Sequence, residues 1–189
     1  MSKKGFSFIE LVVVMGVIGI SLPVLFAIFF GVASQQVKIQ RLSEVKRQGD
    51  YVLNVMETII RNEAKNIFQG YSTPTFSNER CTGTPTDKLY QSTDGTSFYF
   101  KDKSGNEFRF YYDVLDEKIA SESSKFSPPW DLTSSNVRIS NFVISCTRNS
   151  VGTPPIVTVS FDADYNTDST RVEEITAVLH YQTSIKLRN

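Results

Sequence analysis

The chain has 189 residues, and 20 Lys and Arg residues balance 20 Asp and Glu residues, so its formal net charge is zero. A zero net charge argues against binding through counterion release, and we expect no nucleic-acid partner. Two cysteines and one histidine exclude a four-cysteine zinc site and most catalytic arrangements built on imidazole. The length suits one globular domain plus an additional element.

An apolar segment occupies residues 11–33, where 23 residues pass without a charged side chain. As a helix it would be about 34 Å long, which is enough to cross a hydrocarbon core of about 30 Å. A secretory signal has a shorter apolar region that ends at a small-residue cleavage site, and no such site closes this segment. The sequence therefore predicts a single membrane span. Basic residues flank it on both sides, so the positive-inside rule leaves its orientation open.

Glu10 lies within the apolar region, just before residue 11. A carboxylate at the membrane centre costs roughly 2.5–3.5 kcal/mol on insertion scales, and less near the interface. One interpretation is a simple anchor that carries a chance glutamate. In the other, the chain is cut after Gly5, and the free α-ammonium of Phe6 lies within one helical turn of Glu10. Such an ammonium, on this chain or on a neighbour, would neutralise the carboxylate.

The N-terminus resembles the leader of type IV pilins and type II secretion pseudopilins, since residues 3–11 are KKGFSFIEL and an apolar helix follows. The resemblance implies that a prepilin peptidase removes residues 1–5 after Gly5 and methylates Phe6. It implies that Glu10 helps to bring subunits into register in a filament. It also implies a bacterial inner-membrane protein with its C-terminal domain outside the cytoplasm. The implied partners are other pilin subunits, the peptidase, an inner-membrane assembly platform and the lipid bilayer.

The transmembrane and assembly half of the helix, residues 6–33, contains the poor helix formers Gly16, Gly19 and Pro23. Pro23 lacks the N–H that would bond to the carbonyl of Gly19, and both Gly16 and Gly19 weaken a helix. One interpretation is a tolerated kink, which is common in membrane helices. The other, suggested by the resemblance, is a stretch that unwinds when the helix leaves lipid for a filament.

The helical pattern continues through residues 34–68, which form the amphipathic half of the predicted helix. Apolar residues recur at steps of three and four from Leu42 to Ile67, and charged residues fill most of the other faces. No proline interrupts residues 24–73, so we expect one helix from Phe6 to Phe68, roughly 95 Å long.

The pattern becomes β after a turn-rich segment, Gln69–Gln91. The last strand alternates apolar and polar residues, which indicates an antiparallel sheet with one face packed on a helix. We therefore expect an α+β, pilin-like fold, in which residues 69–189 form a globular, β-rich, extracytoplasmic domain. Strands are expected at 97–100, 107–112, 113–120, 137–146, 156–161 and 175–187, with a hairpin turn at 103–106.

The two cysteines, Cys81 and Cys146, are 65 positions apart. If the domain lies outside the cytoplasm, an oxidised pair is the expected state. Such a disulfide would fix the turn-rich segment to the sheet. The other interpretation is two buried free thiols.

Residues 162–173 place oxygen-bearing side chains at the spacing of a 12-residue Ca²⁺ loop. The sixth position, where the loop needs a sharp turn, is Thr167 instead of glycine, and the flanking segments are expected strands instead of helices. A polar hairpin tip, whose Asp and Asn residues favour a turn, is the simpler interpretation. No other cofactor is expected. The candidate Ca²⁺ ligands are Asp162, Asp164, Asn166, Asp168, Thr170 and Glu173.

Few features of this sequence support catalysis, and we expect that the protein is not an enzyme. His180 stands on the polar face of the last strand, and there is no Gly-x-Ser-x-Gly motif or phosphate-binding glycine loop. Trp130 could stack a sugar or peptide, but we expect a core residue or a loop anchor. The predicted function is a structural filament subunit, and residues 130–139 with the C-terminal strand resemble J-class minor pseudopilins. The alternatives are another class of pilin, or a single-span anchor whose outer domain binds a ligand.

Overall fold

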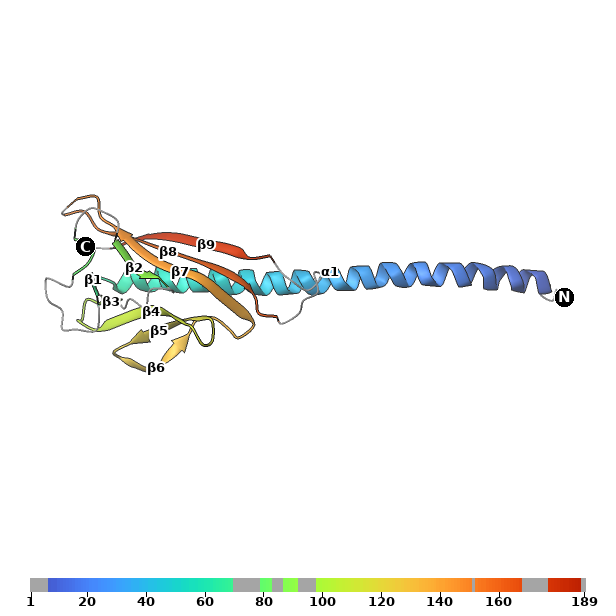
Figure 1. The fold of residues 1–189 in the computed structure, drawn as a ribbon, viewed down its shortest axis with the longest axis horizontal. Coiled ribbons are helices and arrows are strands. Elements are labelled where there is room, and N and C mark those ends of the chain that lie inside the picture. The colour runs from blue at the N-terminus through green and yellow to red at the C-terminus, as the bar shows by residue number, and fades with distance from the viewer. Residues whose placement is uncertain are drawn as a thin grey trace, which may run out of the picture.

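The computed structural model describes residues 7–69, 79–82, 87–91, 98–150, 152–167 and 177–187. A long helix, α1 (Phe8–Glu63), leads into two antiparallel sheets that lie along its C-terminal part (Figure 1). The N-terminal part of α1 projects away from the sheets, so the first turn of this helix lies at the end of the molecule that is farthest from them (Figure 1). A long N-terminal helix with antiparallel sheets is the α+β layout that the sequence predicts.

The strands divide into a five-stranded sheet, in the order β1-β3-β4-β5-β6, and a four-stranded sheet, in the order β2-β7-β8-β9. Neighbouring strands in both sheets are antiparallel. The first sheet contains β1 (Asn66–Gln69), β3 (Phe98–Lys101), β4 (Glu107–Asp113), β5 (Lys118–Ser123) and β6 (Phe126–Asp131). The second contains β2 (Asp87–Gln91), β7 (Val137–Thr147), β8 (Ile156–Tyr165) and β9 (Leu179–Lys186).

Helix α1 ends at Glu63, five residues before the predicted end at Phe68. Ala64 has an extended backbone, with φ −69° and ψ 126°, and its N–H donates to the carbonyl of Ile60. The next residues form β1, in which Ile67 pairs with Phe100 of β3 and is buried. The predicted end of the helix was wrong. Ile67 continues the three- and four-residue spacing of the apolar residues before it, but its backbone pairs with a neighbouring strand instead of with the preceding helical turn.

The predicted hairpin between β3 and β4 is confirmed. Gly105 has φ +86°, a backbone conformation that residues other than glycine rarely adopt. The predicted strand 113–120 was wrong, because residues 114–117 form a turn and β5 begins at Lys118. The sequence also gave no prediction of β2 and β6.

The core lies between the sheets and one stripe of α1. Strands β8 and β9 of the four-stranded sheet make most of the contacts with the helix. The alternation predicted for β9 is confirmed, since Tyr181 and Ile185 are buried while His180 and Gln182 are exposed. The helix contributes Val45, Gly49, Val52, Met56 and Ile60 to the core.

Candidate functional site: the projecting part of helix α1

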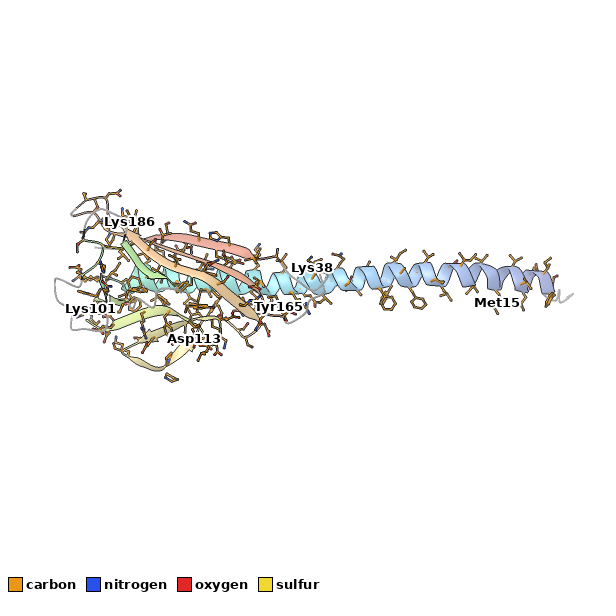
Figure 2. All side chains as sticks on the ribbon, in the orientation of Figure 1. Met15, Lys38, Lys101, Asp113, Tyr165 and Lys186 are labelled. Carbon is orange, nitrogen blue, oxygen red and sulfur yellow. A yellow bond between two sulfur atoms is a disulfide. The ribbon has the colours of Figure 1, made fainter. Side chains whose placement is uncertain are left out.

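The projecting part of α1 presents apolar side chains on every face. The chain has one described helix that is long and apolar enough to cross a membrane, and its most apolar stretch has a mean hydropathy of 2.7 with none of it buried. Figure 2 shows these side chains around the helix between Lys38 and Met15, with no strand beside them. Since apolar surface in water costs roughly 25 cal/mol per Å², this surface requires lipid or another apolar partner. Its exposed residues include Phe8, Ile9, Leu11, Val12, Val13, Val14, Met15, Val17, Ile18, Ile20, Leu22, Val24, Leu25, Phe26, Ile28, Phe29, Phe30 and Val32.

Glu10 lies in the first turn of α1 and acts as part of its cap. Ser7 precedes the helix with an extended backbone, and its N–H donates to Oε2 of Glu10 at 2.9 Å. This is one half of a capping box, and a carboxylate here also interacts favourably with the helix dipole. Sequence reasoning missed this role, although the Ser-x-x-Glu spacing of residues 7–10 signals it. Gly5 and Phe6 lie outside the described residues, so cleavage, methylation and the ammonium contact stay predictions.

The helix runs unbroken through Gly16, Gly19 and Pro23. Within the described part of the chain, a Cβ at either glycine would meet no atom within 4 Å beyond its own helical backbone. Close packing within the described part of the chain therefore does not explain why positions 16 and 19 are glycine. Near the proline, the Ser21 hydroxyl donates to the carbonyl of Val17 at 2.7 Å. The unwinding of this stretch stays a prediction.

The helix enters the globular body where Tyr181 of β9 crosses it. Gly49 permits this approach, because a Cβ at residue 49 would lie 2.2 Å from Cζ of Tyr181. The Tyr181 hydroxyl donates to the carbonyl of Val45 at 3.4 Å, and burial, with a contribution from Asp50, raises the pKa of this hydroxyl. On the next turn towards the N-terminus, the Arg41 guanidinium lies 5.1 Å from the ring centroid of Tyr165. These contacts fix the direction in which the apolar part projects.

Cys81 and Cys146 form a disulfide, with their Cα atoms 6.1 Å apart. Cys146 lies near the end of β7, and both residues are buried. Cys81 has φ +59°, in the left-handed region. The bond therefore joins the segment after β1 to the four-stranded sheet, as predicted.

The Asp-rich segment, residues 162–173, begins within a β-strand and not in the loop that the sequence predicts. Strand β8 extends to Tyr165, so Asp162 and Asp164 lie in a strand instead of the predicted loop. The Asp162 carboxylate accepts one hydrogen bond from the Asn141 side chain at 2.7 Å and pairs with Nδ1 of His180 at 2.6 Å, and these interactions lower its pKa.

The next two candidate Ca²⁺ ligands also have protein partners. Asp164 forms an ion pair with Arg138 at 2.6 Å. The Asn166 side chain donates to the carbonyl of Ser135 at 3.1 Å. Asp168, Thr170 and Glu173 lie outside the described residues. In the part of the chain that is described, no group of three or more His, Cys, Asp or Glu residues could hold a metal ion.

His180 and Trp130 are both on the surface. His180 is an exposed strand residue, as expected, although its pairing with Asp162 was not foreseen. Trp130 is 71% exposed on β6, so the expectation of a core residue or a loop anchor was wrong. Pro128 and Pro129 precede it on β6, which is an edge strand and therefore tolerates proline.

The fold and the projecting helix define an α+β protein whose described residues include one candidate membrane span. The chain matches no protein-family model, no curated protein and no solved structure. The assignment of function therefore depends on the N-terminal motif and on the geometry described above.

Proposed function

We propose that this chain is a structural subunit of a type IV pilus or a type II secretion pseudopilus, matured by a prepilin peptidase and assembled through its N-terminal helix. The leader motif of residues 3–11 and the α+β arrangement, in which a long N-terminal helix precedes antiparallel sheets, support the proposal. In this proposal the chain begins as a single-pass protein of the bacterial inner membrane, with its C-terminal domain extracytoplasmic. The J-class assignment stays a prediction.

The observation that carries the proposal is the projecting part of α1, which is apolar on every face and whose helix continues without a break into the globular body. A helix that is apolar on all faces is stable only inside lipid or among other helices. The same surface can therefore serve both states of the subunit. It contacts lipid before assembly and the helices of neighbouring subunits afterwards, while the body remains outside this apolar bundle.

Glu10 has two compatible tasks in this proposal. Its Oε2 atom accepts a hydrogen bond from the Ser7 N–H, but a carboxylate has further acceptor sites on its two oxygens. Those sites remain for the α-ammonium of a cleaved neighbour. An ion pair in a medium of low dielectric constant is strongly favoured over an isolated carboxylate, and this difference would select the register of adjacent subunits.

Intact-mass measurement of the full-length protein from its native host tests the proposal. The expected mass lacks residues 1–5 and includes one additional methyl group on Phe6. A protein that retains its leader would contradict the proposal and would favour the alternative, a single-span anchor that carries an extracytoplasmic ligand-binding domain.

A further inference from the structure

A cavity of about 290 Å³ opens beside the disulfide. Ile67 and Cys81 line it and are buried, so they form its floor. Lys65 also lines it, and the Lys65 N–H donates to the carbonyl of Lys101 at 2.9 Å. Figure 2 shows Lys101 at the end of the globular body that is farthest from the projecting helix. The cavity therefore lies at this far end.

Three basic side chains line the cavity, and each comes from a different segment of the chain. Lys65 lies between α1 and β1, Arg80 lies on the segment after β1, and Arg148 follows β7. Lys65 and Arg80 are exposed, while Arg148 is half-buried. We call this space the basic cavity.

Two features of the fold hold the arginines at this place. Arg80 precedes Cys81 and Arg148 is two residues beyond Cys146, so the disulfide, with its Cα atoms 6.1 Å apart, joins the two segments that carry them. The Arg80 N–H also donates to the carbonyl of Ile67 at 2.8 Å. Like charges that are held close together repel each other, and a bound group of opposite charge relieves this repulsion.

The described residues that line the basic cavity include one carboxylate, and it already has a partner. Oε1 of Glu79 accepts a hydrogen bond from the Asn66 amide at 2.6 Å. Three positive charges therefore stand against one negative charge among the described lining residues.

The basic side chains keep N–H donors for a ligand. Within the part of the chain that is described, neither Lys65 nor Arg80 forms an ion pair. Arg148 donates from Nε to the carbonyl of Thr153 at 2.7 Å. That bond orients the guanidinium group and leaves its other N–H groups for a ligand.

We propose that the basic cavity binds a phosphate or sulfate group. A guanidinium group pairs with two oxygens of such an anion, and an ammonium group adds a point charge. Cations from three segments suit a tetrahedral anion, whose oxygens point in several directions, better than a planar carboxylate.

The position of the basic cavity bears on where this group comes from. Roughly 45 Å of helix separates residue 33, where the apolar segment ends, from the end of α1 at Glu63. Headgroups of a membrane around the apolar segment therefore do not reach the cavity. The inference goes beyond the proposed function and does not depend on it.

Isothermal titration calorimetry of the full chain in detergent, with the disulfide intact, tests the site. Sodium phosphate and sodium sulfate are each titrated against sodium chloride of equal ionic strength. We expect saturable binding of one phosphate or sulfate per chain, and weaker binding of acetate. No saturable binding of either anion would overturn the inference, and acetate that binds as tightly as phosphate would contradict the assigned ligand class.

Variants identify the residues that bind the anion. Arg80→Gln and Arg148→Gln should each weaken binding about tenfold or more, because each removes a charge-assisted hydrogen bond. Lys65→Gln provides a second exposed position with the same expected direction. In the matched control, Lys103→Gln removes one exposed positive charge from the β3–β4 turn and should leave the affinity unchanged. Equal losses in Lys103→Gln and Arg80→Gln would show general attraction to a basic surface and would refute the site.

A phosphate ester distinguishes a free anion from a group on a larger molecule. If glucose 6-phosphate binds at least as tightly as inorganic phosphate, and Arg80→Gln weakens both, the cavity accepts a phosphate group that is attached to another molecule. If inorganic phosphate alone binds, the ligand is the free anion. Binding of both that is unchanged in Arg80→Gln and Arg148→Gln would contradict the inference.

Discussion

The close approach of β9 to the helix leads to our most specific prediction, that Gly49→Ala destabilises the globular body. The added Cβ would lie 2.2 Å from Cζ of Tyr181. The ring cannot easily turn aside, because Tyr181 is only 8% exposed and stacks on Phe161 with ring centroids 5.2 Å apart. Its hydroxyl is also bonded to the carbonyl of Val45.

Two opposing effects set the magnitude. Alanine is a better helix former than glycine by about 1 kcal/mol. Overpacking a filled core costs typically about 1–3 kcal/mol, and a contact this short with a stacked ring belongs at the upper end of that range. The expected result is a net loss of about 2 kcal/mol in the free energy of unfolding.

Urea unfolding of the full chain in detergent, followed by circular dichroism, measures this loss. Tyr181→Ala supplies the matched background, since it removes the ring that the new methyl group would strike. There, Gly49→Ala should raise stability by about 1 kcal/mol, which gives a coupling of about 3 kcal/mol between the two positions. Equal effects of Gly49→Ala in both backgrounds, or no loss with Tyr181 present, would refute the reasoning.

Four further predictions concern the disulfide, the sheet surface and the N-terminus. Replacing both cysteines with alanine should lower the free energy of unfolding by about 4 kcal/mol, from the chain entropy of the 65-residue separation, measured by the same urea titration. Because hydrogen bonds lower the pKa of Asp162, its stabilisation is present above the ordinary value of 3.8 and is lost as the pH falls through the lowered value. Asp162→Asn should therefore be less stable than wild type at about pH 6, with the difference shrinking towards about pH 3. Glu10→Ala should insert into membranes at least as well as wild type but enter filaments poorly, and wild-type incorporation on immunoblots of filaments would count against its assembly role. Gly5→Val should accumulate uncut precursor, because a side chain obstructs the approach of a peptidase, and normal processing on a gel would exclude the leader assignment.

Local signals in the sequence determined several parts of this protein. A long apolar run gave the projecting helix, and steps of three and four gave the buried stripe that includes Val52 and Met56. Strict alternation gave the two faces of β9, and a glycine between polar residues gave the turn at Gly105. In each case the property belongs to a short stretch of chain, so neighbouring residues suffice to specify it.

Tertiary structure decided what depends on a distant partner. Ile67 fits a helical pattern, but pairing with Phe100 places it in β1. Trp130 looks like a core residue, but it lies on an edge strand opposite a serine and remains exposed. Asp162 fits the spacing of a Ca²⁺ loop, yet its neighbours on adjacent strands, Asn141 and His180, bond its carboxylate. Backbone and carboxylate groups bond to whatever partner the fold brings near, and the residue opposite is 9 or more positions away in each of these cases.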